Sequence, residues 1–281
     1  MSERRVFSMA GVIGWPISHS RSPMLHGYWL RHYGILGSYL PLPVRTDRLE
    51  PALRGLAALG FAGCNVTIPH KEEAMRMVDR VDATATRIGA VNTIVVQPDG
   101  SLSGTNTDAY GFIENLRDGH RGWRADAGPA VVLGAGGAAR SVVVSLIDAG
   151  AGEIRLLNRT RARADQLRDA FGNAVRVLDW HERHAALAGA ALLVNSTNQG
   201  MAGQPPMEIV LDDLPRAAVV NDLVYNPLLT PLLHAARARG NPTVDGLGML
   251  LHQARPGFRA WFGVLPEITA ELRREIEATI G

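Results

Sequence analysis

Residues 65 to 71, NVTIPHK, form the end of an apolar stretch. The last of them, Lys71, could take part in proton transfer. A lysine in that place is either a solvated surface charge or an acid held beside a bound substrate. Small polar residues also stand at the ends of other apolar stretches, and each one alone is typical of a cap or a turn. Together with Lys71 they would form a polar pocket suited to a polyhydroxylated acid: Ser20, Ser22, Thr67, Asn92 and Asp108.

A second motif, VVLGAGGAAR, places Gly134, Gly136 and Ala139 in the pattern G-x-G-x-x-G/A. It follows an apolar strand and opens a predicted helix, which is the context that a dinucleotide-binding turn requires. The glycines let the backbone approach a pyrophosphate, and the helix N-terminus supplies free N–H groups and a partial positive charge. An ordinary strand-to-helix turn is the alternative interpretation.

The next predicted strand ends in LLNRTRAR and indicates which dinucleotide would bind. An enzyme that binds NAD usually has an acidic residue there, bonded to the ribose 2′-hydroxyl. This chain instead has Asn158, Arg159, Thr160 and Arg163. Arginines pair with a 2′-phosphate that an acid would repel, so the motif predicts NADP. A solvated helix start with scattered arginines is the competing interpretation.

The elements that must position these residues alternate between strands and helices. We expect Ser22 to cap a helix whose first position is Pro23. A hairpin should turn at Asp99-Gly100. In the first half of the chain the predicted strands are 6–14, 37–44 and 61–68, the hairpin is 92–108, and the predicted helices are 22–34, 47–59, 71–79, 83–89 and 109–117.

A second alternating series follows from residue 130, with a strand, the glycine turn and a helix over 130–150 and further strands at 153–158, 174–178, 190–195 and 217–222. Alternation of this kind predicts parallel sheets in α/β layers. We therefore expect two α/β domains with a ligand in the crevice between them. One is a substrate-binding domain at 1–108, completed by C-terminal helices at about 247–281, and the other is a Rossmann-type NADP-binding domain at 109–246.

Composition excludes several classes of function. The 281 residues are 46% hydrophobic and 20% charged, which is normal for a soluble globular protein. A net charge of only +2 does not indicate a nucleic-acid surface. The one cysteine, Cys64, rules out an internal disulfide, and a cytoplasmic location fits best. His181 and His184 are not in an H-E-x-x-H frame, so we predict no metal.

The N-terminal stretch MSERRVFSMAGVIGWPIS has two arginines before an apolar run, as a signal peptide does. No clear A-x-A cleavage site follows, so we interpret the stretch as the first strand. No apolar run in the chain approaches the 18 residues that indicate a membrane helix, and we expect no membrane span.

Nine ordered stretches between residues 14 and 254 make the chain resemble the shikimate dehydrogenase family, the NADP-dependent enzymes of aromatic amino acid biosynthesis. They are GWPISHSRSPMLH, GCNVTIPHK, GAVNT, GTNTDAYGF, VLGAGGAAR, NRTRARA, VNSTNQGM, NDLVYNPLLTPLL and DGLGMLLHQA. The resemblance implies NADPH-dependent, reversible reduction of 3-dehydroshikimate to shikimate.

The resemblance also implies roles for individual residues. Ser20, Ser22 and Tyr225 would bind the substrate carboxylate. Lys71 and Asp108 would be the catalytic pair. The ring hydroxyls and the reacting oxygen would be bound by Thr67, Asn92, Asp108 and Gln253. The cofactor would be held by Gly134, Ala135, Gly136, Gly137, Ala138, Asn158, Arg159, Thr160 and Arg163, with Gly246 and Met249 near the nicotinamide.

These implied roles agree with the chemistry. Hydride addition to a ketone leaves negative charge on oxygen, which a protonated lysine stabilises and then protonates. A nearby aspartate would keep the lysine charged, whereas partial burial would lower its pKa. One departure concerns Pro256, which stands inside the predicted helix after Gln253 and removes a backbone donor there. The aim of Gln253 is therefore open.

Two alternatives remain at the level of sequence. A quinate/shikimate dehydrogenase of broader specificity would share the same motifs and differ near the Ser20 and Ser22 region. A non-catalytic NADP-binding sensor could use the same scaffold, although Lys71 and Asp108 are both present. We expect a small-molecule partner, with no nucleic acid or membrane, and either a monomer or a homodimer.

Overall fold

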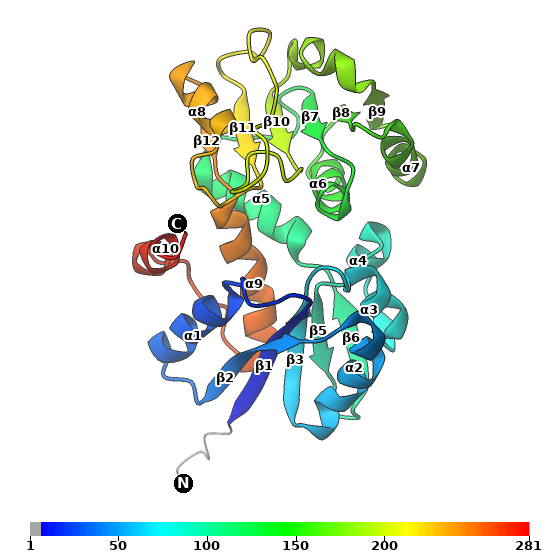
Figure 1. Ribbon diagram of the computed structural model, residues 1–281, viewed down its shortest axis with the longest axis vertical. Helices are drawn as coiled ribbons and strands as arrows, with labels where there is room; N and C mark the ends of the chain where they lie inside the picture. The colour runs from blue at the N-terminus through cyan, green and yellow to red at the C-terminus, as the bar shows by residue number, and fades with distance from the viewer. Residues whose placement is uncertain (1–6, 281) are drawn as a thin grey trace. The chain divides into compact units, whose positions relative to one another are not determined.

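The computed structural model describes residues 7–280, and these residues form two compact α/β units. The first unit consists of the chain up to Thr107 together with Gln253–Ile276. The second unit consists of Asp108–His252 with the residues after Ile276. Each unit contains a six-stranded sheet (Figure 1). Residues 1–6, which include the start of the predicted first strand and the arginine pair before it, lie outside the described residues.

The first unit has a mixed sheet in the order β2-β1-β3-β5-β6-β4. Strands β1 and β3 are parallel neighbours. β5 and β6 are antiparallel, as the predicted hairpin requires, and β5 is also antiparallel to β3, which the alternation of strands and helices did not predict. The strands are β1 Ser8–Gly14, β2 Gly37–Pro43, β3 Phe61–Val66, β4 Arg80–Val81, β5 Thr93–Val96 and β6 Leu102–Thr105. Because β1 and β3 are parallel, the segments that follow them leave the sheet at the same edge.

Helices cover both faces of this first sheet. The helices are α1 Ser22–His32, α2 Leu49–Ala58 (after a 3₁₀ turn at Thr46–Arg48), α3 Lys71–Met77, α4 Ala83–Ile88, the C-terminal part of α9 Leu247–Phe262, and α10 Ala270–Glu277. On one face, α2 packs Leu53 and Leu56 against Val66 and Ile94 of the strands. On the other face α9 buries Trp261, whose indole N–H donates to the carbonyl of Ile94 at 2.9 Å.

The second unit has an all-parallel sheet in the order β12-β11-β10-β7-β8-β9. Its strands are β7 Ala130–Leu133, β8 Ile154–Leu157, β9 Val175–Leu178, β10 Leu192–Asn195, β11 Val219–Asp222 and β12 Thr243–Val244. Numbered along the chain, this is the order 3-2-1-4-5-6 read from the other edge, which is the Rossmann arrangement. The predicted fold class is therefore confirmed, with one mixed sheet and one parallel dinucleotide-binding sheet.

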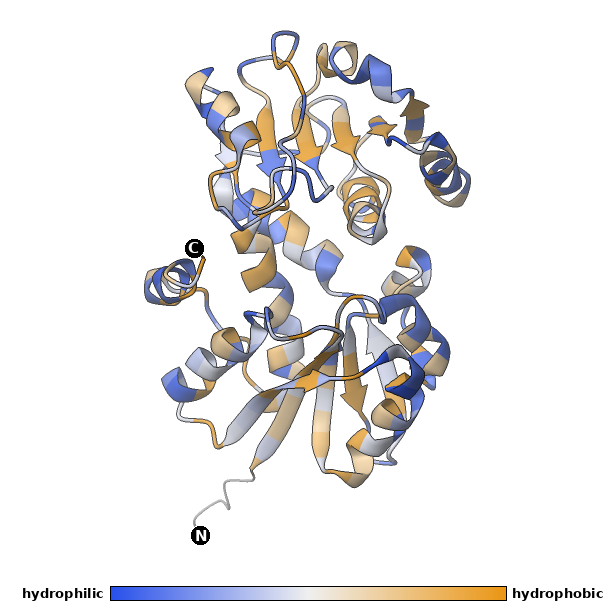
Figure 2. Cartoon of the chain, viewed as in Figure 1, coloured by the Kyte–Doolittle hydropathy of each residue, from blue (hydrophilic) through white to orange (hydrophobic). Residues whose placement is uncertain are grey.

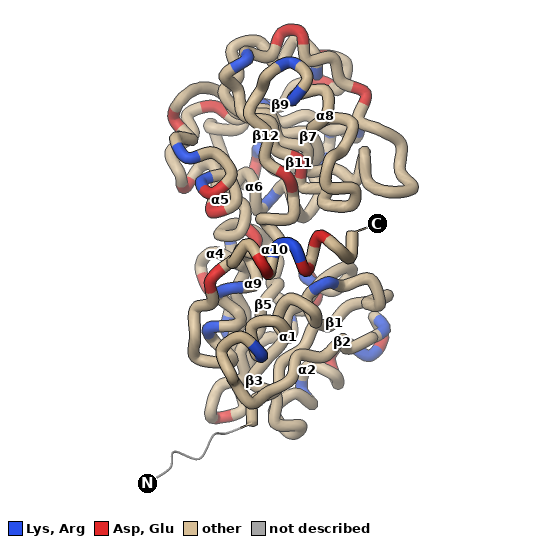
Figure 3. Tube along the Cα trace, turned by 90° about the vertical axis from the view of Figure 1, so that its left-hand side faces the viewer, with Lys and Arg blue, Asp and Glu red and all other residues tan. Residues whose placement is uncertain are grey.

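Two hydrophobic layers enclose the second sheet, so its strands are apolar along most of their length (Figure 2). The helices are α5 Asp108–Gly119, α6 Gly137–Asp148, α7 Arg161–Phe171 and α8 Pro231–Ala238, with 3₁₀ turns at Trp180–Arg183 and Ala185–Leu187. Helices α5, α6 and α7 cover one face, and α8 with the 3₁₀ segment around Leu187 covers the other. Charged residues of both signs are interspersed over the two units (Figure 3).

Two helices differ locally from what their sequences predict. Ser22 was expected to cap α1, but the N-cap is Arg21 and has no side-chain cap bond, and it is Ser20 whose hydroxyl accepts the Ser22 N–H, at 3.3 Å. The prediction of the cap residue was therefore wrong by position. Helix α9 continues through Pro256 despite the missing donor.

Within residues 7–280, no helix has the length and apolar character needed to cross a bilayer.

Candidate active site

The turn after β3 is fixed to the sheet by its own backbone. The Thr67 N–H donates to the carbonyl of Ile13 in β1 at 2.9 Å, and the His70 N–H donates to the carbonyl of Thr67 at 2.9 Å. The His70 ring is fully buried and bonds the Val44 carbonyl at 2.7 Å through Nε2. Lys71 then begins α3, half-buried, at the same edge where β1 and β3 end. His70 is thus a structural residue, and the turn places the predicted candidate Lys71 four residues after Thr67.

Asn92, directly before β5, joins this group. The carbonyl of Lys71 accepts the N–H of Val91 at 2.9 Å, and the carbonyl of Asn92 accepts the N–H of Val66 at 2.8 Å. The Asn92 side chain is buried, and its Oδ1 accepts the backbone N–H of Thr107 at 2.9 Å. These backbone bonds hold the segments that carry Thr67, Lys71 and Asn92 side by side.

A buried polar network that sequence reasoning missed lies beneath these residues. The Tyr39 hydroxyl donates to Asn65 Oδ1 at 2.6 Å, and Asn65 Nδ2 donates to Thr93 Oγ1 at 3.0 Å. Thr93 in turn donates to Asn92 Oδ1 at 2.9 Å. Asn65, in the middle of the apolar stretch AGCNV, was the available signal, because a buried polar side chain in a strand needs partners.

Ser20 and Ser22 follow β1 along the chain. The Ser20 N–H donates to the carbonyl of Ile17 at 3.0 Å, which forms a turn at the start of α1. Ser22 is buried beside the hydroxyl of Tyr39. Burial raises the pKa of the Tyr39 phenol well above its ordinary value, and the hydrogen bond from Ser22 offsets part of that rise. Asp108 is the first residue of α5, directly after Thr107, and is half-buried.

The glycine turn between β7 and α6 is packed at one end and open at the other. Gly134 has φ +109°, and a Cβ there would lie 2.6 Å from Ser196 Oγ. Gly136 and Gly137 have no atom within 4 Å of the place a Cβ would occupy, and both are exposed. The first turn of α6 holds no acidic residue. This surface fits a bound pyrophosphate, because the open glycines admit it and the helix N-terminus favours its charge.

Asn158 ties the end of β8 to the glycine turn. Its Oδ1 accepts the backbone N–H of Ala135 at 3.2 Å, and its Nδ2 donates to the carbonyl of Thr160 at 2.8 Å. The amide therefore sets the spacing between the two motifs that the sequence assigned to the cofactor.

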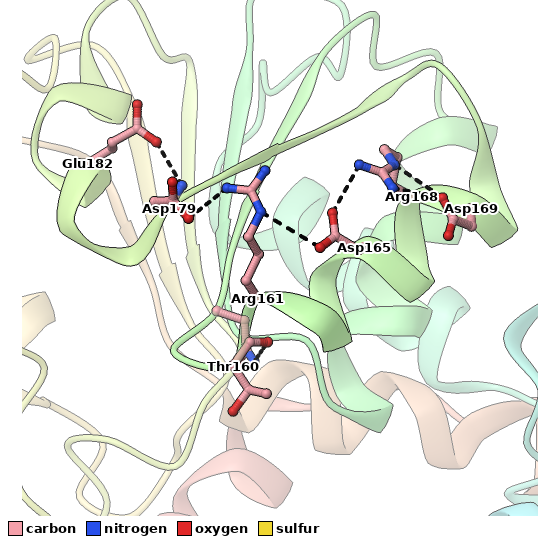
Figure 4. Close-up of polar contacts among 8 residues, drawn as sticks. Thr160, Arg161, Asp165, Arg168, Asp169, Asp179 and Glu182 are labelled. Carbon is pink, nitrogen blue, oxygen red and sulfur yellow. Dashed lines mark hydrogen bonds and ion pairs between the residues drawn. The ribbon is translucent and has the colours of Figure 1, made fainter.

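Three arginines follow Asn158, and the structure separates them. Figure 4 shows Arg161 between two acids, with Nη1 2.6 Å from Asp179 and Nε 3.7 Å from Asp165. Arg159 and Arg163 are exposed, and within residues 7–280 neither guanidinium has a hydrogen bond or an ion pair. The two arginines that the sequence assigned to a 2′-phosphate are thus the two that no acid neutralises.

A second buried network lies at the ends of β10 and β11. Asp222 is fully buried and accepts hydrogen bonds from Asn195 Nδ2 at 2.9 Å, the Val224 N–H at 3.0 Å and Thr230 Oγ1 at 2.7 Å. Its hydrogen bonds to Val224 and Thr230 hold the two ends of the loop that carries the predicted candidate Tyr225. The Tyr225 side chain is half-buried. Burial raises the pKa of Asp222 to about 6, and the three hydrogen bonds act against that rise.

The remaining predicted residues lie around α9. A Cβ at Gly246 would lie 2.2 Å from the Leu223 carbonyl oxygen, so glycine there allows close backbone packing. Met249 packs, half-buried, against the core under α5 and α6. Gln253 lies on α9 three residues before Pro256 and is half-buried. Among residues 7–280, no group of three or more His, Cys, Asp or Glu side chains is placed to hold a metal ion.

The second unit has the Rossmann arrangement and an open glycine turn. The first is an α/β unit with a polar cluster at the carboxyl ends of its strands. Together these features define a two-domain, dinucleotide-dependent oxidoreductase. Residues 12–94 match the shikimate dehydrogenase substrate binding domain, and residues 123–202 match shikimate / quinate 5-dehydrogenase. A shikimate dehydrogenase (NADP(+)) of Paramagnetospirillum magneticum is 60% identical over 265 residues, which cover 94% of this chain and 96% of the relative. The chain belongs to the shikimate dehydrogenase family.

Solved structures agree with this membership. Shikimate 5-dehydrogenase from Thermus thermophilus, in complex with NADP(H) and shikimate, is 38% identical with a TM-score of 0.86, covering 98% of this chain and 100% of that one. Quinate dehydrogenase from Corynebacterium glutamicum, in complex with NAD, is 31% identical with a TM-score of 0.88, covering 98% of this chain and 99% of that one.

Proposed function

We propose that this protein is an NADP-dependent shikimate dehydrogenase that reduces 3-dehydroshikimate reversibly to shikimate in the pathway to chorismate and the aromatic amino acids. Residues 1–108 and the C-terminal helices would bind the substrate, and residues 109–246 would bind the cofactor. The relative that is 60% identical is named for this activity. The Thermus thermophilus relative binds both shikimate and NADP(H).

The observation that carries the proposal is that Lys71 is the only lysine in the chain. The other 28 of its 29 Lys and Arg residues are arginines. An arginine serves a surface ion pair or a phosphate at least as well as a lysine does, but its guanidinium does not give up a proton at neutral pH. The one position with lysine is therefore the position where a titratable cation matters. It stands in the motif NVTIPHK, beside Thr67 and Asn92.

In the direction of reduction, Lys71 donates a hydrogen bond to the ketone oxygen and then transfers its proton to it. This stabilises the negative charge that develops on that oxygen, which is worth most where water is excluded. Asp108 would orient the ammonium group. Thr67, Asn92 and Gln253 hold the ring hydroxyls, whereas Ser20, Ser22 and Tyr225 donate to the carboxylate.

When bound, NADPH supplies the hydride. Gly134 to Ala138 and the N-terminus of α6 would hold its pyrophosphate, and Gly246 and Met249 would lie near the nicotinamide. Asn158 and Thr160 would help to hold the adenosine 2′-phosphate. Arg159 and Arg163 would pair with the 2′-phosphate. Among residues 7–280 no acid forms an ion pair with either arginine, which supports this assignment because there is no existing ion pair to break.

A broader quinate/shikimate dehydrogenase is the second candidate. It is favoured by the likeness to a quinate dehydrogenase that was solved with NAD. Ser20 and Ser22, together with the Arg159 and Arg163 pair, favour the shikimate-specific, NADP-using activity instead.

Initial rates of dinucleotide reduction by the purified protein test the proposal. Shikimate and quinate are each combined with NADP⁺ and with NAD⁺. The proposal predicts fast turnover only with shikimate and NADP⁺. Comparable turnover with quinate or NAD⁺ would establish the broader activity, and NADP binding without turnover on either acid would show a non-catalytic sensor.

A further inference from the structure

We propose that Tyr39, which no motif assigns to the site, is a positioning residue that fixes Ser22 and Asn92 relative to each other. Its hydroxyl lies between a serine proposed to bind the substrate carboxylate and an asparagine proposed to bind a ring hydroxyl. The inference rests on the proposed function, because it concerns affinity for a hydroxylated cyclic acid.

The contacts run from the edge of the sheet to its centre. Tyr39 lies on the edge strand β2, and its hydroxyl donates to Asn65 Oδ1 on β3 at 2.6 Å. Asn65 Nδ2 donates to the carbonyl of Asn92 at 3.1 Å and to Thr93 Oγ1 at 3.0 Å. Thr93 donates to Asn92 Oδ1 at 2.9 Å. The four side chains are all buried, so each lost partner leaves an unpaired polar group away from water.

The chemistry of the partners fixes the direction of every bond. A backbone carbonyl only accepts, so the Asn65 atom that faces the Asn92 carbonyl must be the Nδ2 donor. Asn65 Oδ1 therefore faces Tyr39 and requires a donor, which the phenol hydroxyl supplies. Thr93 uses its one proton toward Asn92 Oδ1, and this oxygen also accepts the Thr107 N–H. The Asn92 amide is thus held both by the Thr107 N–H and by a chain of hydrogen bonds that begins at Tyr39.

Helix α1 holds the other side of Tyr39. Ser22 and His26 are four residues apart and lie on one face of this helix. Ser22 is buried beside Tyr39, and the His26 ring stacks on the Tyr39 ring with centroids 3.9 Å apart and planes 2° from parallel. Burial lowers the pKa of His26 to about 3, so this ring is neutral in the stack. Tyr39 therefore sets the register of α1, and of Ser22 with it, against the sheet that carries Asn92.

The variant Tyr39→Phe tests the inference, because it keeps the stacked ring and removes only the hydroxyl. The matched control is Tyr28→Phe. Tyr28 is a buried tyrosine of α1 whose hydroxyl also contacts two groups, Thr269 at 3.0 Å and Glu271 at 3.1 Å, and neither belongs to the polar cluster. The measurements are kcat, KM for shikimate at saturating NADP⁺, KM for NADP⁺ at saturating shikimate, and Tm.

We expect Tyr39→Phe to raise KM for shikimate about tenfold, the effect of losing one net hydrogen bond of about 1.4 kcal/mol. KM for NADP⁺ should stay within about twofold of the wild-type value. Tyr28→Phe should lower Tm comparably and leave both KM values within about twofold. If Tyr39→Phe does not fold, the near-isosteric variant Thr93→Val takes its place. Thr93→Val should also raise KM for shikimate.

The inference is overturned if Tyr39→Phe, or Thr93→Val in its place, lowers Tm but leaves KM for shikimate at the wild-type value. It is also overturned if both KM values rise equally, as a general loss of structure would produce. Failure of the proposed function looks different, because the wild-type protein itself would then show no turnover with shikimate.

Discussion

The side chains of Asn195 and Asp222 are joined by a hydrogen bond of 2.9 Å at the ends of the neighbouring strands β10 and β11. Asn195 also accepts the backbone N–H of Thr197 at 3.0 Å, in the turn that packs against Gly134. Asp222 accepts from Thr230 at the N-cap of α8. One buried carboxylate thus connects the turn beside the glycine motif to the loop that carries Tyr225.

This carboxylate should make stability depend on pH in a defined direction. The pKa of Asp222 rises from 3.8 to about 6 in the folded protein. The folded state therefore retains a proton that the unfolded state has lost between these values. The stability that this proton contributes is present below pH 3.8 and is lost as pH rises to about 6. Relative to Asp222→Asn, we expect the free energy of unfolding to fall by about 3 kcal/mol across that window.

Urea unfolding of the wild-type protein and of Asp222→Asn, between about pH 4 and about pH 7.5, measures this difference directly. Asparagine has nearly the same shape and does not titrate, so most other ionisable groups cancel in the comparison. A difference that stays constant over the whole range would show that Asp222 is ionised in the folded protein throughout.

Substitutions at two glycines of the same turn should affect different properties, stability at Gly134 and cofactor binding at Gly136. Gly134→Ala forces a Cβ to within 2.6 Å of Ser196 Oγ at φ +109°, so we expect it to cost about 1–3 kcal/mol of stability. Gly136→Thr adds its side chain to open space at the N-cap of α6, where threonine and glycine are similarly suited. We expect the Gly136 variant to keep its Tm and to raise KM for NADP⁺ at least tenfold. Equal losses of Tm in the two variants would contradict this division.

The choice of cofactor should depend on Arg159 and Arg163 but not on Arg161. The double variant Arg159→Ala/Arg163→Ala should lower kcat/KM for NADP⁺ by about 10- to 100-fold, because charge-assisted bonds to a phosphate are lost. Its kcat/KM for NAD⁺, which has no 2′-phosphate, should hardly change.

Arg161→Ala is the matched control for that comparison. Arg161 lies on the same segment as Arg159 and Arg163, but its guanidinium is already paired with Asp165 and Asp179. We expect both values of kcat/KM to remain within about twofold in this variant. If Arg161→Ala reduces the preference for NADP⁺ as strongly as the double variant does, the assignment of the phosphate to Arg159 and Arg163 is wrong.

The sequence predicted the features that depend on local pattern. Short segments of the sequence determine three features: the alternation of strands and helices, the turn at Asp99-Gly100 and the glycine motif before α6. The structure contains all three. The N-cap of α1 was misplaced by one residue. Propensity favours serine at an N-cap and so pointed to Ser22, whereas the helix begins at Ser22 itself and follows an Arg21 that makes no side-chain cap bond.

The networks under the site could not be predicted in the same way. Tyr39 and Asn65 are 26 residues apart and meet only because β2, β1 and β3 are neighbours in the sheet. Asn195 and Asp222 are 27 residues apart and meet through the pairing of β10 with β11. The sequence marks such residues only as polar side chains in apolar strands, and their partners follow from strand order.

The role of Lys71 can be tested by one comparison, that of kcat for shikimate oxidation in Lys71→Ala and in the wild-type protein. NADPH affinity is measured in parallel by fluorescence titration. Because no other lysine is present, no neighbouring amine can substitute for the missing one. We expect kcat to fall by about 10²- to 10⁴-fold with NADPH affinity within about twofold, the usual effect of removing a general acid–base group. A Lys71→Ala protein that kept near-normal kcat would show that the proton comes from another source.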